Sequence, residues 1–489
     1  MIEKPIVKIG FVPSYRDFGP RVIPKWCVKM REDALISFNK IKGLKIVAPT
    51  SSPNEPRAID AKQGYSPYGS ICNLDQAEAI ATFFAQEQVD GIIIGALDFG
   101  DERSAGKIAE MLNVPVLLYA TREPEVPEHP SLARVSDSYC GTLSIASALY
   151  RRGLKFHYAG IFYAEEEEFI NQVDQFIKAV SVVKALKRAR IGQIGVRPAT
   201  FETVGYSETS MIKKFGQNVI YSDLSDIVAK AKALKNEDEK VKSKVDEIRH
   251  EVAEVTISDE WFFKAAKMEL TIADFFIQNR LSAVGIQCWP AIQKLWGFST
   301  CALFGRLTGQ GMLTACETDI LGSLSMLVSF SAAKYETVPH FIDWTIQHRE
   351  NENRFLAWHC GNAPVCLAAN SKKTALRSRV DMRGVLPADL GDSQAGLYQF
   401  QLKPGQVTIC RLAEYDGQWK MLIAPGHIIP SDEELAGTWS WVEVKDHLRL
   451  YRILVEEGFI HHASMIHNDQ QKSLELACKF MDIRPVILD

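Results

Sequence analysis

The first 330 residues alternate between short apolar runs and longer segments with helical periodicity, and this alternation limits the folds available to the chain. The apolar runs fall at residues 7–13, 44–48, 89–95 and 114–119, and the helical segments at 26–41, 74–87, 105–112 and 136–151. A second series begins near residue 156 and includes a strand-like run at 281–287. Strands that alternate with helices predict parallel sheets covered by helices on both faces.

After about residue 331 the pattern changes to short β-prone runs separated by turns. Asp416–Gly417 lies between two of these runs and predicts a hairpin. A chain of 489 residues is too long for one ordinary domain. We therefore predict two doubly wound, Rossmann-like α/β domains at residues 1–160 and 161–330, followed by a β-rich C-terminal domain at 331–489.

Charge and composition argue against several classes of partner. The 56 basic and 60 acidic residues give a net charge of −4, and no basic stripe suggests a nucleic-acid partner. No apolar run approaches the ~20 residues that a membrane-spanning helix needs, and the start lacks the apolar core of a signal peptide. The ten cysteines include no C-x-x-C pair, which favours reduced, buried thiols over a zinc ribbon. These features predict a cytoplasmic protein.

The loops after the first and third apolar runs, residues 14–21 and 96–104, are candidate ligand-binding segments. Parallel sheets bind ligands beyond the carboxyl ends of their strands. Neither loop holds a glycine-rich nucleotide motif, so no nucleotide cofactor is predicted. Arg16 and Arg21 are candidates for contact with an anionic or polyhydroxyl ligand, and solvated loop arginines are the alternative.

The segment 309–319 (GQGMLTACETD) is typical of a loop that leads into a helix. Thr314 as the cap and Glu317 three residues later fit a capping box, which is the structural interpretation. The functional interpretation adds Asp343, an acid in a short apolar strand, and a histidine from the pair His461–His462. Two acids and one imidazole suit a divalent cation such as Mn²⁺ or Mg²⁺.

Five segments carry a resemblance to a known family. They are KIGF at 8–11, TGQG with ACETD within 308–319, FID at 341–343, FLAWHCG at 355–361 and GFIHH at 458–462. The chain resembles the L-fucose isomerase/L-arabinose isomerase superfamily, and the fucose isomerase branch more closely. The resemblance implies Mn²⁺ held by Glu317, Asp343 and His461, with His462 and His467 as alternatives to His461. It also implies two α/β domains followed by a β-rich domain, and a homo-oligomer, commonly a hexamer.

The reaction implied by the resemblance is the interconversion of an aldose and a ketose through an ene-diol. The metal would hold two substrate oxygens and polarise the carbonyl. Glu317 and Asp343 would ligate the metal and also act as acid and base. The sequence does not assign either acid to a particular substrate carbon.

The substrate-binding residues expected are Arg16, Gln287 and His359, of which the resemblance implies His359, because its segment contacts substrate in fucose isomerases. A packed structural histidine is the alternative for His359, and a loop-capping side chain is the alternative for Gln287. Trp289 is expected to pack in the core. Ile460 replaces the asparagine common in fucose isomerases, which favours a sugar other than fucose. Arginines are candidates for binding a sulfonated or phosphorylated hexose, namely Arg16, Arg21, Arg306, Arg349 and Arg354.

Two other functions are compatible with these patterns. A non-catalytic sugar-binding or regulatory protein could use the same scaffold, and it would bind a monosaccharide without exchanging its C2 proton. A periplasmic-type binding protein is disfavoured because no signal peptide is recognisable.

Overall fold

The computed structural model describes residues 5–16, 25–123, 135–378 and 394–488. They form two compact units. The N-terminal unit contains Pro5–Lys184 with Lys479–Met481, and the C-terminal unit contains Ala185–Cys478 with the residues from Asp482 onward. This division is coarser than the three domains predicted with boundaries at 160 and 330, which stay a prediction. None of the described helices is long and apolar enough to cross a membrane.

The N-terminal unit is built on a five-stranded sheet with the strand order β2-β1-β3-β4-β5. All four strand pairings are parallel. The strands are β1 (Val7–Ser14), β2 (Leu44–Val47), β3 (Gly91–Ala96), β4 (Val116–Thr121) and β5 (Phe156–Phe162). The helices are α1 (Lys25–Phe38), α2 (Leu74–Gln86), α3 (Glu102–Leu112), α4 (Ser138–Arg151) and α5 (Glu167–Leu186), the last of which continues past the unit.

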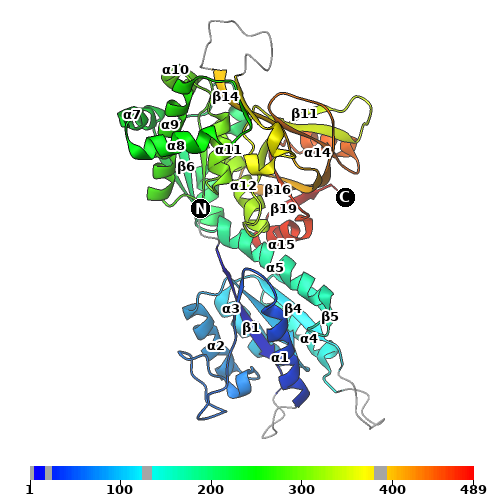
Figure 1. Cartoon of the computed structure of the whole chain (residues 1–489). Coiled ribbons are helices and arrows are strands. Elements are labelled where there is room, and N and C mark those ends of the chain that lie inside the picture. Colours follow the sequence, from blue (N-terminus) through cyan, green and yellow to red (C-terminus); the bar gives the residue numbers. More distant parts are fainter. Residues whose placement is uncertain (1–4, 17–24, 124–134, 379–393, 489) are drawn as a thin grey trace. The chain divides into compact units, whose positions relative to one another are not determined.

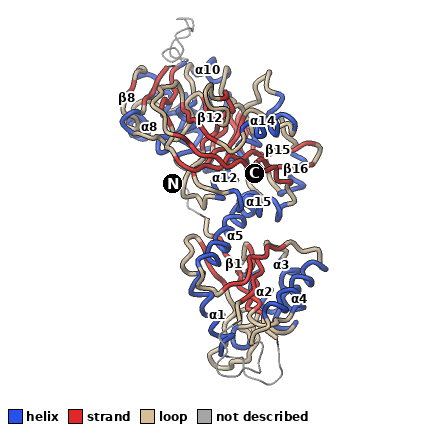
Figure 2. Tube along the Cα trace, turned by 90° about the vertical axis from the view of Figure 1, so that its right-hand side faces the viewer, coloured by secondary structure: helices blue, strands red, loops and turns tan. Residues whose placement is uncertain are grey.

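Each face of this sheet has its own hydrophobic core. Ile92 and Ile94 of β3 pack with α2, α3 and α4, whereas Ile93 between them packs with α1 and α5. Figure 2 shows these two helix layers on opposite sides of the strands. A strand buried on both faces reads as a continuous apolar run, which is why GIIIGA has no polar alternation. The predicted α/β architecture is confirmed here.

The C-terminal unit contains a second parallel sheet of four strands in the order β10-β9-β6-β7. Its strands are β6 (Arg190–Ile194), β7 (Asn218–Ser222), β9 (Ala283–Ile286) and β10 (Thr314–Cys316). Its helices are α6 (Glu208–Phe215), α7 (Leu224–Ala233), α8 (Glu239–Arg249), α9 (Asp259–Gln278), α10 (Ala291–Trp296), α11 (Cys301–Gly309) and α12 (Ile320–Ala332). The charged segment 224–255 forms two helices, because Leu234 leaves the first in an extended conformation and Asp238 starts the second.

The same unit contains a ten-stranded mixed sheet in the order β19-β16-β15-β18-β11-β12-β17-β14-β13-β8. Its strands are β8 (Glu254–Val255), β11 (His340–Gln347), β12 (Arg354–His359), β13 (Ala375–Ser378), β14 (Ala395–Gln401), β15 (Gly405–Tyr415), β16 (Gln418–Ile429), β17 (Thr438–Glu443), β18 (His462–His467) and β19 (Arg484–Ile487). Two further helices are α14 (His447–Glu456) and α15 (Gln471–Met481). The predicted hairpin is confirmed: Asp416 and Gly417 have φ of 51° and 81° and join β15 to β16.

Helix α12 connects the two sheets of the C-terminal unit (Figure 1). It packs against β9 of the parallel sheet and against β15 and β18 of the mixed sheet. Every one of its 13 residues is buried, and Ser325 and Ser329 bond to backbone carbonyls four residues earlier. A helix that is buried all round, with its serine hydroxyls bonded to its own backbone, is expected only in such a position. The first turn of α12 is therefore fixed from all sides, and the candidate site lies there.

Candidate active site

The turn between β10 and α12 has an unusual backbone. Glu317 and Thr318 are both left-handed, with φ of 61° and 55°, although neither is glycine and Thr318 is β-branched. Such residues persist only where their surroundings hold them, and they are common at functional sites. The predicted capping box is wrong, because Thr314 lies in strand β10 and Asp319 caps the helix by accepting a hydrogen bond from Gly322 N–H at 2.8 Å. Glu317 is thereby free of any capping role.

His462 is the centre of the site. It is the first residue of β18 and lies directly opposite Asp343 of β11 in an antiparallel pair. Facing residues on one side of a sheet have neighbouring side chains. His462 Nε2 lies 3.6 Å from Asp343 Oδ1 and 3.0 Å from Glu317 Oε2. Three segments distant in sequence thus converge on one imidazole nitrogen.

A second histidine, His359 at the end of β12, lies beside His462 in the same cluster. Its ring stacks on that of His462 with centroids 6.2 Å apart. His359 Nδ1 accepts a hydrogen bond from the Cys360 N–H at 2.8 Å, while its Nε2 is buried without a hydrogen-bond partner. In its neutral form, a ring with Nδ1 as acceptor carries its proton on Nε2. His359 therefore presents an N–H group to the site.

The carboxylates set the protonation of both rings. Burial disfavours the charged form of His462, but Asp319, Glu317 and Asp343 outweigh burial and raise its pKa to about 10. Burial likewise opposes the charge on His359, but chiefly Asp343 raises its pKa to about 9. The pKa of Glu317 is lowered, because His462, His359 and the Trp289 N–H together outweigh its burial. The acids of the site therefore attract positive charge.

The acid oxygens also suit a divalent cation. No hydrogen bond of acceptable geometry reaches Glu317 Oε2 or Asp343 Oδ1, although both are buried and face His462 Nε2. A buried acceptor without a partner costs free energy unless something else satisfies it. Two groups have ligand atoms within 4.8 Å of one another: Glu317 with His461 and His462, and Asp343 with His359 and His462. His462 is common to both groups.

Family models match at both ends of the chain. The N-terminal domain model of fucose/sulfoquinovose isomerases matches residues 41–187, and the C-terminal domain model of L-fucose isomerases matches residues 357–488. The chain belongs to the fucose isomerase-like family. It is an aldose–ketose sugar isomerase.

Similar proteins carry a consistent name. A sulfoquinovose isomerase of Alkalicoccus urumqiensis is 26% identical over 390 residues, which are 79% of this chain and 83% of that protein. A sulfoquinovose isomerase of Priestia aryabhattai is 24% identical over 412 residues, 84% of this chain and 88% of that protein. Among solved structures, the match to a periplasmic solute-binding protein from Actinobacillus succinogenes with bound D-allose covers 68% of this chain and 90% of that one, at 12% identity and a TM-score of 0.16.

The structure brings Glu317 and Asp343 of the isomerase to His462, with His461 beside them. The rings of His461 and His462 lie 4.0 Å apart, and His461 also contacts Phe201 edge to face. His467 lies at the opposite end of β18, where its ring bonds the Lys403 carbonyl at 2.9 Å. Which of the two adjacent histidines is the ligand stays a prediction.

The other expected contacts lie in different settings. Gln287 accepts a hydrogen bond from Val196 N–H at 3.2 Å, as a loop-capping side chain would. Arg16 belongs to the N-terminal unit, where its guanidinium stacks 3.5 Å from the Phe99 ring centre. Arg21 lies outside the described residues. Arg306 and Arg354 are paired with acids of the isomerase, so neither is available to a ligand.

Sequence reasoning missed three residues of this site. Trp289, expected in the core, is 39% exposed and donates from Nε1 to Glu317 Oε1 at 2.8 Å. Asp319 accepts from His462 Nδ1 at 2.9 Å, and Arg411 pairs with Asp319. One signal was available: an arginine within the apolar strand sequence VTICRLA indicates a buried charge that needs an acidic partner.

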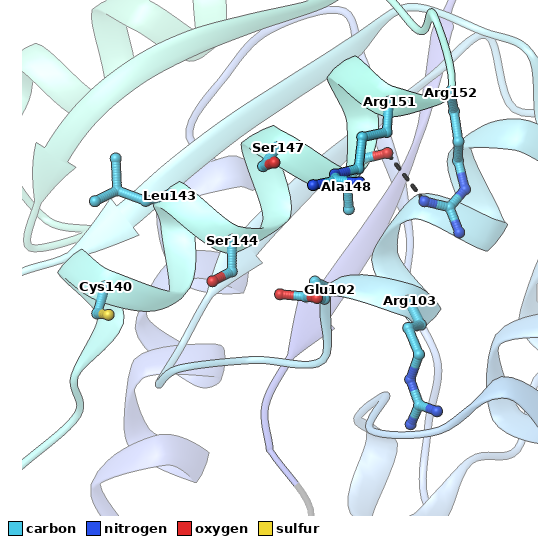
Figure 3. Close-up of a pocket in the computed structure, with 9 residues that line it drawn as sticks. All are labelled: Glu102, Arg103, Cys140, Leu143, Ser144, Ser147, Ala148, Arg151 and Arg152. Atoms are coloured by element: carbon cyan, nitrogen blue, oxygen red, sulfur yellow. Dashed lines mark hydrogen bonds between the residues drawn. The ribbon is translucent and has the colours of Figure 1, made fainter.

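A separate pocket of about 470 Å³ lies between α3 and α4 of the N-terminal unit (Figure 3). Two of its basic side chains already have partners within the protein. Arg152 donates a hydrogen bond to the Ala148 carbonyl at 2.9 Å, and Arg103 forms an ion pair with Asp101 at 3.3 Å. The pocket shares no residue with the cluster around His462.

Proposed function

We propose that this isomerase depends on a divalent cation, Mn²⁺ or a similar ion, and converts an anionic hexose such as sulfoquinovose into its ketose through an ene-diol. The observation that carries the metal is the pair of buried acid oxygens, on Glu317 and Asp343, that face His462 Nε2 without a well-directed hydrogen bond. Two carboxylate oxygens and one imidazole nitrogen suit Mn²⁺.

Glu317, Asp343 and His462 would hold the cation, with His462 replacing His461 as the favoured ligand. His462 is 1% exposed and touches both acids, whereas His461 is exposed. When bound, the cation supplies Lewis-acid polarisation of the substrate carbonyl. His359 would donate a hydrogen bond from its Nε2–H group to a substrate oxygen. The hydrogen bond that its Nδ1 accepts from the Cys360 N–H favours this proton position.

The two acids differ in a way that suits different proton transfers. Trp289 fixes Glu317 through Oε1, while the Asp343 side chain is 25% exposed and no hydrogen bond reaches its Oδ1. A base that carries a proton between adjacent carbons needs some freedom to move. We assign to Asp343 the transfer of the proton from C2 to C1, and to Glu317 the hydroxyl proton that moves between O2 and O1.

The anionic substrate rests on the names of the relatives and on residue type. The matched relatives are sulfoquinovose isomerases that are 24–26% identical to this chain. Arg349, in the same unit as His462, remains a candidate for the sulfonate, since Arg306 and Arg354 are occupied. Arg16 and Arg21 remain candidates for contact with an anionic ligand in the N-terminal unit.

Exchange of the C2 proton in deuterated water tests the proposal. Chelator-treated protein should lose exchange on sulfoquinovose and regain it with Mn²⁺. Glu317→Gln and Asp343→Asn should each be folded and inactive. Activity that survives removal of all divalent cations would contradict the metal role. Binding of sulfoquinovose without exchange in loaded wild type would contradict sulfoquinovose as the substrate.

Two further properties carry over from the family resemblance as proposals. We infer a homo-oligomer, commonly a hexamer in fucose isomerases, and a cytoplasmic location. Sedimentation velocity would test the first, because a hexamer of 54.8 kDa chains sediments far from a monomer. None of the ten cysteines, all of which lie in the described part of the chain, forms a disulfide, as a reducing compartment favours.

A further inference from the structure

Asp319 is a buried carboxylate whose acceptor sites are all used. It accepts from Gly322 N–H at 2.8 Å, from Arg411 Nη1 and Nη2 at 2.5 and 3.0 Å, and from His462 Nδ1 at 2.9 Å. Asp319 is 0% exposed and Arg411 3%. A helix cap needs only the first of these contacts. Of the other three, two join the cap to Arg411 and one joins it to the histidine at the centre of the site.

The fold places the two acids of one turn on opposite sides of one ring. Glu317 faces His462 Nε2 at 3.0 Å and Asp319 faces Nδ1 at 2.9 Å. In an extended chain, the side chains of residues 317 and 319 would point to the same side and run parallel to each other. The left-handed backbone of Glu317 and Thr318 changes their directions, so that the two acids can face one ring from opposite sides. Arg411 reaches Asp319 from β15, which pairs with β18 and places Cys410 opposite Ser464, two residues after His462.

This arrangement selects one tautomer of His462. Arg411 keeps Asp319 ionised, and an ionised carboxylate can only accept hydrogen bonds. His462 Nδ1 must therefore be the donor, and the neutral ring has its lone pair on Nε2, which faces Glu317 and Asp343. His359 has the opposite arrangement, with Nδ1 as acceptor. The two stacked histidines are thus prepared for different tasks.

We propose that Asp319 and Arg411 are positioning residues that hold the His462 proton on Nδ1 and so keep Nε2 open to the cation. This inference rests on the proposed function, since it assumes that a cation binds at His462. Carboxylates that orient a metal-binding imidazole typically change metal affinity 10- to 100-fold when they are altered.

Asp319→Asn is the decisive variant. Its amide oxygen must take the Oδ1 position, where Gly322 N–H and Arg411 Nη2 both donate. The amide nitrogen then takes the Oδ2 position, beside His462 Nδ1 and Arg411 Nη1. It turns His462 Nδ1 into an acceptor, moves the ring proton to Nε2 and loses the hydrogen bond from Arg411 Nη1. Asparagine is also a good helix cap, so α12 keeps its start. We expect the Kd for Mn²⁺ to rise about 10- to 100-fold, and pulsed EPR of bound Mn²⁺ to lose one imidazole ¹⁴N coupling.

Glu269→Gln is the matched control. Glu269 is another buried acid of the C-terminal unit, 1% exposed and paired with buried Arg306, but it lies in a different cluster. Its amide variant should lose stability and keep the Mn²⁺ Kd of wild type. If Asp319→Asn fails to fold, the double variant Asp319→Asn/Arg411→Met removes the unpaired guanidinium and makes the same tautomer prediction.

The outcomes separate the two proposals. A wild-type protein that takes up no Mn²⁺ overturns the proposed function, and this inference with it. A wild type that binds Mn²⁺ beside an Asp319→Asn variant with a Kd within twofold and unchanged ¹⁴N couplings overturns this inference alone. A weaker Kd in that variant with an unchanged Kd in Glu269→Gln supports it.

Discussion

At the scale of single residues, the site depends on how each donor atom is held. Glu317 has one oxygen on Trp289 and the other toward His462. Asp343 has no comparable anchor on Oδ1. The two acids therefore differ in mobility although both are carboxylates in the same cluster, and single substitutions should separate their roles.

Trp289→Phe tests the anchoring of Glu317. The variant keeps an aromatic ring against Phe201 and removes only the N–H that bonds Glu317 Oε1. A hydrogen bond to a charged group contributes about 1.5–3 kcal/mol, so kcat/KM should fall about 10- to 100-fold. Steady-state kinetics with saturating Mn²⁺ give the measurement. An unchanged kcat/KM in a variant of unchanged melting temperature would show that the hydrogen bond from Trp289 to Glu317 does not contribute to catalysis.

His340 predicts how stability depends on pH. Burial lowers its pKa to about 3, against about 6.5 in an unfolded chain. Between these two pKa values only the unfolded state binds a proton on this histidine. The free energy of unfolding therefore decreases as the pH falls below about 6.5. Relative to His340→Gln, wild type should lose about 1.4 kcal/mol per pH unit there. Urea unfolding at pH 7, 6 and 5 measures this, and parallel curves for the two proteins would refute it.

Some residue roles could be predicted from sequence and others could not. Glu317 and Asp343 lie in short motifs, and the structure brings them to one imidazole. The pairing of Asp319 with Arg411 joins residues 92 positions apart, which no local pattern reveals. The same limit explains the mistaken capping box, because two left-handed residues without glycine leave no sequence signal.

At the scale of elements, α11 is fixed by a buried charge cluster. Arg306, 3% exposed, bonds Glu269 at 2.7 Å, Glu247 at 2.9 Å and also Glu251. Because Glu247 and Glu251 belong to or follow α8 and Glu269 belongs to α9, one guanidinium joins three helical segments. The packing of this region is therefore sensitive to one side chain.

Arg306→Met should destabilise the protein by about 3–5 kcal/mol, because it leaves the buried Glu269 carboxylate with less compensation. Arg354→Met is the matched control, since Arg354 pairs with Glu443 at 2.7 Å while both side chains remain at least 30% exposed. That pair should contribute within about 1 kcal/mol. Chemical denaturation of both variants gives the comparison, and equal losses would refute the distinction.

The turn before α12 carries backbone strain that a glycine would relieve. A β-branched residue held left-handed costs about 1–3 kcal/mol. Thr318→Gly should therefore keep or raise the free energy of unfolding, while the looser turn lowers kcat. Thr314→Gly, in the extended strand β10, should destabilise instead. Thermal unfolding distinguishes the two, and a Thr318→Gly variant less stable than Thr314→Gly would contradict the strain.

At the scale of the whole molecule, the cluster around His462 lies within the C-terminal unit. Parallel sheets could be predicted along the chain because alternation is a local signal. The ten-stranded sheet could not, since its order depends on pairings such as β8 with β13, which join residues near 254 and 375.

Calorimetry with and without Mn²⁺ tests this location. A ligand that binds only the folded state adds about 2.7 kcal/mol at 100 times its Kd. That increment should raise the unfolding transition of the C-terminal unit and leave that of the N-terminal unit unchanged. A shift of both transitions by the same amount, or of neither, would contradict a site confined to the C-terminal unit.

The wide spacing of the three proposed ligands has a consequence for biosynthesis. His462 follows Glu317 by 145 positions (462 − 317). At translation speeds of about 5–20 residues per second, Glu317 leaves the ribosome roughly 7–29 s before the imidazole that unites the ligands. A nascent chain therefore cannot capture its ion with the full set, and metallation must follow the assembly of β18 rather than guide it.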